Sequence, residues 1–385
     1  MSGTPTTAQA PVSYTITASN SSGNATTIIS ITISGWVHEA YLKASNGEGT
    51  DQFGYSAAIS ADTIVVGATN ESSNQTTITN GTTASADNSA GNSGAAYVFK
   101  RTGTTWVQEA YLKAPNANGG DQFGINVSIS GDTIVVGAWQ EDSNQTTITN
   151  GTTASSDNSL SASGAAYVFK RTGSIWAQEA YLKAPNAGGS DYFGLVVSIS
   201  EDTIVVGAPY EDSNQTTITN GTTASADNSA GSSGAAYVFK RTGTTWAQEA
   251  YLKAPNADGS DGGDFFGSSV SISGDTIVVG AWREDSNQTT ITNGTTATGD
   301  NSRLQSGAAY VFKRTGSTWA QEAYLKAPNA GGSDNFGRSV SISTDTIVVG
   351  AYGEDSNQTA ITNGTTASTN NSAGNSGAAY VFRRY

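Results

Sequence analysis

The sequence contains no cysteine, only one histidine (His38), and few charged residues, which make up 13% of its 385 positions. Without cysteine the chain forms neither disulfides nor thiolate metal sites. A single histidine excludes zinc sites that are built from several histidines. No run of about 18 apolar residues is present, so we expect no transmembrane helix. Residues 1–30 lack a basic start followed by an apolar stretch, so the sequence itself shows no export signal.

Basic residues are also scarce, with 18 Lys and Arg against 32 Asp and Glu and a net charge of −14. Phosphate backbones bind to basic surfaces, so we expect no nucleic-acid partner. Glycine is abundant instead, at 45 residues, and Ser, Thr and Asn are frequent. This composition favours a turn-rich, all-β chain over helices.

Internal repetition is the strongest feature of the sequence. Five near-identical units follow one another from residue 36 to residue 385, each opened by a tryptophan. They begin at Trp36, Trp106, Trp176, Trp246 and Trp319, with spacings of 70, 70, 70 and 73 residues. Units that cannot bury both of their own faces stack against their neighbours, so we treat residues 36–385 as one repeat domain.

Each unit carries four strand signals, which are clearest around the second unit. The first strand, FGxxVSIS, alternates in polarity at residues 123–130, and the second, TIVVGA, is a short apolar run at residues 133–138. The third and fourth strands are AAYVFK at residues 165–170 and WAQEAYLKA at residues 176–184. Four strands in each of five units predict a five-bladed β-propeller of four-stranded blades.

The types of strand at the two ends of the repeat array also predict how this ring closes. The repeats begin on a fourth strand, at residues 36–44, and end on a third strand, at residues 378–383. We therefore expect the N-terminal strand to pair with the last blade, which removes the free edges of the array. An open stack, or a ring that a partner chain completes, is the alternative.

Two further segments have strand-like patterns. Residues 1–35 hold two alternating runs, SYTITAS and TTIISITIS, which predict a β-hairpin that is too small to have its own core. The long connection between the second and third strands contains Asn-Gly in every unit, and we interpret it as a Thr-rich β-ribbon, with a polar loop as the alternative. Both segments are candidates for self-association by strand addition. The asparagines of these pairs are Asn80, Asn150, Asn220, Asn293 and Asn363.

The motifs FG, VVGA and GAAYVF resemble those of FG-GAP repeats, the units of the integrin α-subunit propeller and of many bacterial surface proteins. The resemblance covers residues 36–385, although integrin propellers have seven blades. It implies a binding or adhesion module that is secreted or displayed at the cell surface. Residues 1–35 resemble the last half of a bacterial immunoglobulin-like domain, so we expect the export signal to lie outside this sequence.

The same resemblance raises the question of calcium, because related repeats often carry a DxDxDG loop between the first two strands. Here that connection offers a single aspartate, such as Asp132 in SGDT. A calcium ion takes about six to eight oxygen ligands, so we expect no family calcium site and no cofactor. The insertion DGSDGGDFF supplies the only metal candidates, Asp258, Asp261 and Asp264, with a plain flexible loop as the alternative.

The copies differ from one another mainly at two places, directly after FG and directly after VVGA. Strands alternate in direction across a blade, so both places should lie on the same face of the propeller. Aromatic residues and arginine are enriched at binding surfaces, which favours a binding role over random drift at exposed positions. The predicted ligand-binding residues are Trp139, Tyr210, Trp282, Arg283, Tyr352, Tyr55 and Arg338.

We expect no enzymatic activity, because the sequence shows no phosphate loop, no nucleophile elbow and no pair of carboxylates in contrasting environments. The first hypothesis is a module that binds an extracellular protein through the variable face. A lectin that binds glycans on its aromatic rings is the second. A structural protein that forms filaments or surface layers by strand addition is the third.

Overall fold

The computed structural model describes residues 9–33, 36–259 and 262–385. The chain packs as two units, of which the first comprises Met1–Leu42 with Gly103–Trp106 and the second comprises Lys43–Thr102 with Val107–Tyr385. The described residues form strands, turns and loops, and they contain no α-helix. Within these ranges no segment is a helix long and apolar enough to cross a membrane.

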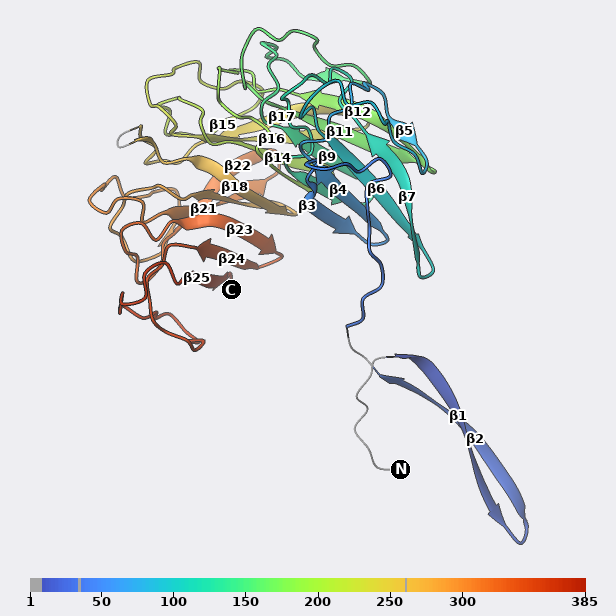
Figure 1. Ribbon diagram of the computed structural model, residues 1–385. Coiled ribbons are helices and arrows are strands. Elements are labelled where there is room, and N and C mark those ends of the chain that lie inside the picture. Colours follow the sequence, from blue (N-terminus) through green and yellow to red (C-terminus); the bar gives the residue numbers. More distant parts are fainter. Residues whose placement is uncertain (1–8, 34–35, 260–261) are drawn as a thin grey trace. The chain divides into compact units, whose positions relative to one another are not determined.

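The first unit contains a two-stranded antiparallel hairpin (Figure 1), made of β1 (Gln9–Asn20) and β2 (Gly23–Ile33). The register places Tyr14 opposite Ile29, as the alternating pattern requires. The hairpin predicted within residues 1–35 is therefore confirmed. Its resemblance to half of an immunoglobulin-like domain stays a prediction.

The five repeats form five antiparallel sheets in the described residues, which we number 1 to 5 in chain order. Sheet 1 contains β3 (Phe53–Ser60), β4 (Thr63–Ala68), β5 (Thr79–Asn80), β6 (Ala95–Thr102) and β7 (Thr105–Leu112). Sheet 2 contains β8 (Val127–Ser130), β9 (Thr133–Ala138), β10 (Thr149–Asn150), β11 (Ala165–Thr172) and β12 (Ile175–Leu182). Sheet 3 contains β13 (Val196–Ser200), β14 (Thr203–Ala208), β15 (Thr219–Asn220), β16 (Ala235–Thr242) and β17 (Thr245–Leu252).

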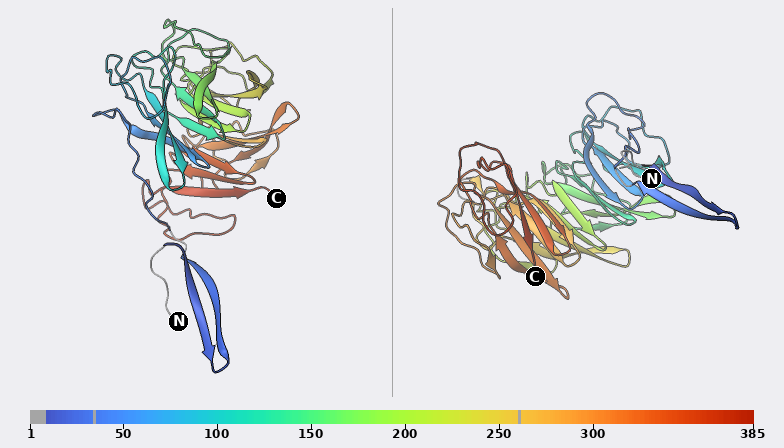
Figure 2. Two further views of the ribbon diagram at one scale, coloured as in Figure 1. Left: turned by 90° about the vertical axis from the view of Figure 1, so that its right-hand side faces the viewer. Right: turned by 90° about the horizontal axis from the view of Figure 1, so that it is seen from below.

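Sheet 4 contains β18 (Phe266–Ser273), β19 (Thr276–Ala281), β20 (Thr292–Asn293), β21 (Ala308–Thr315) and β22 (Thr318–Leu325). Sheet 5 has three strands, β23 (Phe336–Ser343), β24 (Thr346–Ala351) and β25 (Ala378–Arg383). Figures 1 and 2 show the five sheets of this unit side by side in chain order. The strands expected from the repeat pattern are present in every sheet, apart from the fourth strand of sheet 5.

A separate hydrophobic core lies between each pair of consecutive sheets, and the described residues form four such cores. Between sheets 2 and 3, for example, Val168 and Leu182 on one face meet Phe239 and Trp246 on the other. Each of these side chains is at most 1% exposed. Burial of this kind, repeated at every interface, stabilises a stack whose single sheets have no core of their own.

The glycines of the FG and VVGA motifs allow the sheets to approach closely. A Cβ atom on Gly137 of sheet 2 would lie 1.9 Å from the carbonyl oxygen of Gly194 in sheet 3. Real Cβ atoms do not approach a backbone oxygen this closely, so a larger residue would push the sheets apart. The two motifs therefore meet at the interface between neighbouring repeats.

The Asn-Gly segments do not form projecting ribbons, so that prediction is wrong. In each of the first four repeats the Thr-Asn pair forms a two-residue fifth strand, as β10 does beside β12 (Thr149 opposite Tyr181). The asparagine side chain then bridges to another sheet. Asn150 accepts a hydrogen bond from the Trp246 backbone N–H at 2.7 Å and donates one to the Trp246 carbonyl at 3.1 Å. This pairing with a neighbouring sheet competes successfully with a local hairpin.

The predicted ring closure is not confirmed. Residues 36–42 form no strand, and within the described ranges β25 pairs only with β24. No described hydrophobic core joins sheet 5 to sheet 1. The repeated antiparallel sheets are therefore established. The number of blades in a closed propeller stays a prediction.

Candidate functional site: an aromatic arc across the repeats

The residue before FG has an unusual backbone conformation in every repeat. Its φ angle lies between 54° and 57° in Gln52, Gln122, Tyr192, Phe265 and Asn335. This left-handed region costs roughly 1–2 kcal/mol for residues other than glycine. Strain of this size persists where neighbouring structure enforces it, and it is often associated with function.

The loop of the preceding repeat enforces this conformation. The Tyr192 N–H donates to the Ala162 carbonyl at 3.2 Å, and the Phe193 N–H donates to the Ser163 carbonyl at 3.2 Å. The side chain of Phe193 is fully buried, which fixes the next position as well. The side chain before FG is thereby directed to the junction between two consecutive sheets.

Five aromatic rings meet in an unbroken series at these junctions, and we call them the aromatic arc. Ring centroids are 4.5 Å apart for Trp139 and Tyr192, 4.6 Å for Tyr192 and Tyr210, and 4.7 Å for Tyr210 and Phe265. Phe265 and Trp282 follow at 5.5 Å. The first three pairs are edge-to-face, a geometry that favours aromatic contact. The arc runs from the end of β9 in sheet 2 to the end of β19 in sheet 4.

Two arginines lie against the last rings of the arc. The Arg283 guanidinium carbon is 5.1 Å from the centroid of the Phe265 ring and 5.7 Å from that of Trp282. Arg338, from sheet 5, lies 5.3 Å from the Trp282 centroid. Cation–π contacts of this kind hold charged groups at an aromatic surface.

The arc is neither a core nor a set of fully exposed rings. Tyr210 is 37% exposed and Phe265 is 7% exposed, whereas Trp139, Tyr192 and Trp282 are partly buried. The indole N–H of Trp139 donates to the Gln122 side chain at 2.8 Å, which fixes the orientation of that ring. Aromatic rings that are partly exposed and already fixed by neighbouring contacts lose little conformational entropy on binding.

Two residues of the arc are directly preceded in sequence by buried acids. Asp191 and Asp264 precede Tyr192 and Phe265 in sequence and are at least 96% buried. Burial raises the pKa of Asp191 to about 7 and that of Asp264 to about 8. Burial disfavours the charged form of both carboxyls, and this is the largest cause of the two raised pKa values.

The family model of the FG-GAP repeat matches this sequence five times. The matched residues are 36–99, 106–169, 176–239, 246–312 and 319–382. The chain belongs to the FG-GAP repeat family. No curated protein matches the sequence. In this FG-GAP protein the motifs that define the family build the scaffold, and the arc is built from the positions at which the repeats differ.

The structure brings five of the seven predicted binding residues together, namely Trp139, Tyr210, Trp282, Arg283 and Arg338. The other two, Tyr55 and Tyr352, are each 57% exposed. Neither has a ring contact or a cation–π contact within the described part of the chain. They lie on the first and last sheets, beyond the ends of the arc.

The sequence-based prediction missed Tyr192 and Phe265, which link the predicted residues into one series. Their signal was present, since the position between Asp and FG varies among Gln, Tyr, Phe and Asn while its neighbours stay constant. What the sequence does not show is the left-handed conformation, which turns this side chain towards the neighbouring repeat.

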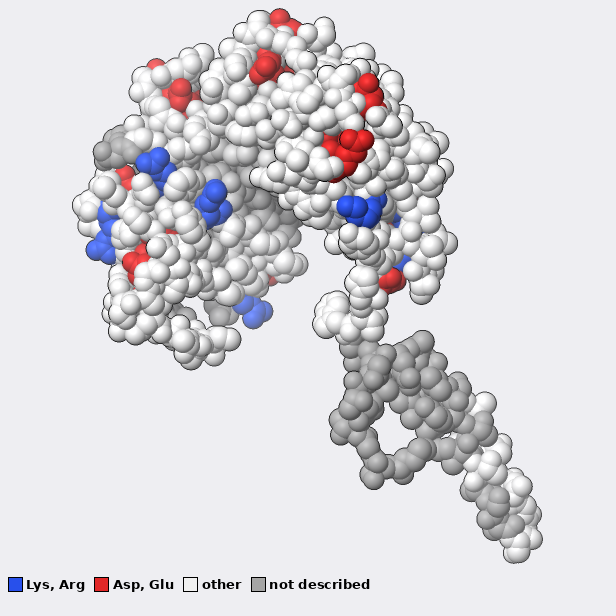
Figure 3. Space-filling model, viewed as in Figure 1, with Lys and Arg blue, Asp and Glu red and all other residues white. Residues whose placement is uncertain are grey.

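The metal candidates are only partly described. The Asp258 N–H donates to the Asp264 carboxylate at 3.2 Å, so these two residues are neighbours, while Asp261 lies outside the described residues. Among those that are described, no three His, Asp or Glu side chains are grouped to hold a metal ion. Carboxylates on the face shown in Figure 3 form several separate spots and no single broad patch.

Proposed function

We propose that this FG-GAP protein is a non-catalytic binding module that recognises an extracellular protein through the aromatic arc. One observation carries the proposal: five rings and two arginines from different repeats are in continuous contact where the repeats differ in sequence. Tryptophan, tyrosine and arginine provide most of the binding energy at protein interfaces. Secretion or display at the cell surface is part of the proposal, in keeping with the extracellular setting of many FG-GAP proteins.

The ring geometry favours a protein ligand over a glycan. Sugars stack on a free aromatic face, but the arc presents ring edges, because successive rings contact one another edge to face. Trp282 has Arg283 and Arg338 close to its ring. Their guanidinium groups suit carboxylates on a protein partner. A lectin therefore remains the second candidate.

Alanine substitution of the arc tests the proposal. The variant Trp139→Ala, Tyr210→Ala, Trp282→Ala is applied to arrays of extracellular-matrix proteins and of glycans, beside the unmodified protein. A binding residue of this kind contributes about 2 kcal/mol or more, so affinity for the protein ligand should fall by at least about 30-fold. Binding of matrix proteins at unchanged affinity would overturn the assignment, and loss confined to the glycan array would favour the lectin.

The exposed tyrosines outside the arc provide the matched control. The variant Tyr55→Ala, Tyr352→Ala removes two aromatic rings from the first and last sheets without touching the arc. It should keep the affinity of the unmodified protein within about twofold, since exposed residues outside an interface contribute little. Circular dichroism of both variants establishes that neither has lost its strands.

A further inference from the structure

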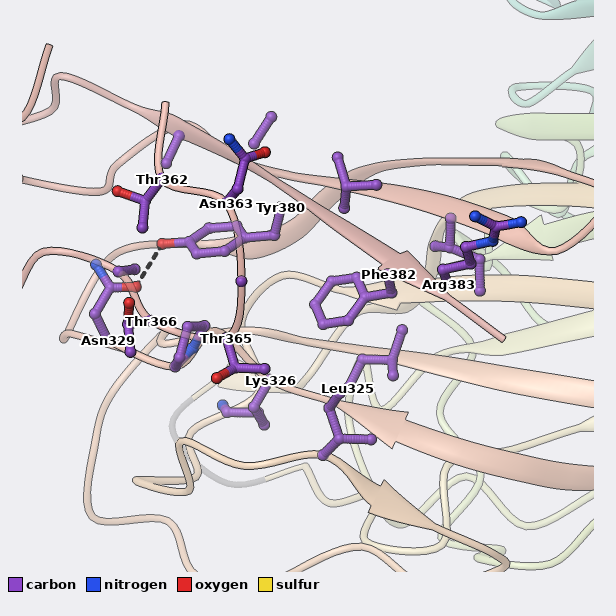
Figure 4. Close-up of a pocket in the computed structure, with 18 of the residues that line it drawn as sticks. Leu325, Lys326, Asn329, Thr362, Asn363, Thr365, Thr366, Tyr380, Phe382 and Arg383 are labelled. Carbon is purple, nitrogen blue, oxygen red and sulfur yellow. Dashed lines mark hydrogen bonds between the residues drawn. The ribbon is translucent and has the colours of Figure 1, made fainter. Parts of the chain in front are cut away.

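A cavity of about 1260 Å³ lies beside β25 of sheet 5. It is lined by sheet 4, sheet 5 and the loop that precedes β25. Figure 4 shows Tyr380 and Phe382 of β25 on one side, Leu325 and Lys326 at the end of β22 on the other, and Thr362–Thr366 across the far end. The cavity occurs at the position where sheets 1 to 4 have a fourth strand.

Sheet 4 shows what normally fills this position. Its fourth strand, β22, places Trp319 and Tyr324 against the face of sheet 3, where they are 1% and 0% exposed. The same two side chains of β17, Trp246 and Tyr251, fill the interface between sheets 2 and 3. The cavity beside β25 therefore corresponds to the space that one tryptophan and one tyrosine of the fourth strand fill in sheets 3 and 4. Within the described ranges, sheet 5 lacks that strand.

The polar partners of that tryptophan are also in place. At the preceding interface the Trp319 backbone N–H donates to Asn220 at 2.7 Å, and its indole N–H donates to Glu249 at 2.8 Å. The equivalent residues one repeat later are Asn293 and Glu322, and both line the cavity. Within the described chain, neither is bonded to a tryptophan.

A buried carboxylate in sheet 5 lacks the cation that its counterparts have. In the preceding repeats the buried pairs Lys183–Glu141, Lys253–Glu211 and Lys326–Glu284 have N–O distances between 2.8 and 3.0 Å. The lysine always directly follows the fourth strand. Glu354, the next carboxylate in this series, is 3% exposed, and within the described residues it forms no ion pair. An uncompensated buried charge of this kind is strongly destabilising.

One segment of the sequence has the residues that all these positions require. Residues 36–43 read WVHEAYLK, against WAQEAYLK in the fourth strands of the interior sheets. They form no strand, and Trp36 and Tyr41 are 104% and 80% exposed. Lys43 is also exposed. In the position of the missing strand, Trp36 of this segment would donate hydrogen bonds to Asn293 and Glu322. Lys43 would form the ion pair with Glu354.

A short linker decides which copy of the chain supplies the segment. Asn46 is fixed on sheet 1, where its side chain donates to Glu71 at 3.0 Å and accepts from the Tyr97 hydroxyl at 2.6 Å. The four Cα–Cα steps from Leu42 to Asn46 span at most about 14 Å. The segment therefore reaches only a sheet that packs directly on sheet 1.

In the described residues, sheets 1 and 5 of one chain do not pack on each other. Ile59 on sheet 1 and Val381 on sheet 5 are 63% and 68% exposed, whereas their counterparts Ile199 and Val168 are 6% and 0% exposed at an interior interface. Sheet 1 of a second copy, by contrast, can stack on sheet 5 as sheet 3 stacks on sheet 2.

We propose that residues 36–43 of a second copy of this chain complete sheet 5, with the sheet 1 of that copy stacked on the sheet 5 face that contains Val381. The contact is heterologous, because one end of each chain meets the opposite end of the next. It repeats from copy to copy and produces head-to-tail assemblies. Strand addition by residues 1–35 is not required for this association.

Cysteine cross-linking tests the proposal directly, because the chain has no cysteine of its own. The interior register pairs Val168 with Ala180, and it places Ala40 of the second copy opposite Val381. Cα atoms that are directly opposite one another lie within disulfide range. Chains with Ala40→Cys and chains with Val381→Cys are mixed, oxidised and separated without reductant.

The mixture should yield a covalent dimer, and the double variant Ala40→Cys, Val381→Cys should yield a ladder of covalent oligomers. Adding Trp36→Ala should reduce the dimer yield by about tenfold, the loss expected for a buried tryptophan anchor. An exposed control, Ile28→Cys on β2 mixed with Val381→Cys, should not form the dimer.

Two outcomes would overturn the proposal. A double variant that remains a single chain with an internal disulfide, at all concentrations, would mean that the ring closes on itself. Absence of any disulfide in both experiments would mean that the segment does not occupy the cavity. Ligand binding by the aromatic arc is unaffected by either result, since Ala40 and Val381 lie outside the arc.

Discussion

Sheets 3 and 5 have nearly the same sequence, yet their strands are buried to very different extents. The strand TIVVGA is buried along its whole length in β14, whereas buried residues alternate with more exposed ones in β24. Val238 is 0% exposed and its counterpart Val381 is 68% exposed. The sequence is the same, so the difference comes from having a neighbouring sheet on one face or on both. Stability in this protein is a property of the interfaces between repeats.

The largest expected effect of this difference is on two tryptophans at equivalent positions. Trp246→Ala removes a side chain that is 1% exposed from an interior interface, and it should lower the free energy of unfolding by about 3–5 kcal/mol. Trp36→Ala should change the stability of the monomer by less than about 0.5 kcal/mol, because Trp36 is fully exposed. Urea denaturation followed by circular dichroism, at a concentration where the protein is monomeric, measures both. Equal losses would contradict the comparison, because Trp36 would then be buried within its own chain.

The sequence predicts the interior of this molecule much better than its ends. The apolar strands, the turns and the five-fold repeat are local patterns, so β9, β11 and β12 could be assigned before the structure was known. The closing strand that the sequence predicts at residues 36–44 is not confirmed, because its pairing depends on how far successive sheets rotate, which no local pattern encodes. Similarly, Asn150-Gly151 has the signature of a hairpin turn, but the asparagine is bonded to Trp246, 96 residues later in the sequence.

The candidate site was predictable in part for the same reason. Variation among repeats identified Trp139, Tyr210 and Trp282, and this needs only a comparison of copies. The contacts between them pass through Tyr192 and Phe265, whose left-handed conformation depends on the loop of the preceding repeat. Interactions between repeats are therefore what the sequence leaves undetermined, both at the site and at the ends of the stack.

The second effect concerns pH. It tests whether the ionisation of aspartates buried at the interior interfaces destabilises the folded state. Burial raises the pKa of Asp121 and of Asp191 to about 7, well above the value near 4 expected in the unfolded chain. Between pH 4 and pH 7 the folded state therefore binds more protons than the unfolded state. Stability should fall as pH rises through this range, by up to about 1.4 kcal/mol per pH unit for each group, and should level off above it.

Substitution by asparagine separates this effect from other titrations. Asp191→Asn keeps an oxygen that accepts the Gly188 N–H, which lies 2.7 Å from the carboxylate, but it removes the charge. This variant should be more stable than the unmodified protein at pH 8 and equally stable at pH 4. Thermal unfolding at the two pH values provides the measurement. A variant that is less stable at pH 8 would show that the ionised carboxylate is favourable where it lies.

The smallest effect should be chemical and slow, and it distinguishes Asn-Gly pairs by their position in the stack. The side chains of Asn80, Asn150 and Asn220 are each held by two hydrogen bonds to the backbone of a tryptophan in the next sheet. Those of Asn293 and Asn363 have no such bonds in the described structure. Deamidation at Asn-Gly requires the side chain to turn and react with the following backbone nitrogen, and the two hydrogen bonds oppose that rotation.

Peptide mass spectrometry after incubation at alkaline pH should therefore find deamidation at Asn293 and Asn363 before it appears at the other three sites. The same measurement at high protein concentration sharpens the comparison, because a second copy that docks on sheet 5 would bring Trp36 to Asn293 and slow its reaction. Asn80 should be unaffected by concentration, since its partner Trp176 is already in the same chain. Equal rates at all five sites would mean that the hydrogen bonds to tryptophan do not restrain these side chains, and the distinction between interior and terminal repeats would then not extend to the Asn-Gly segments.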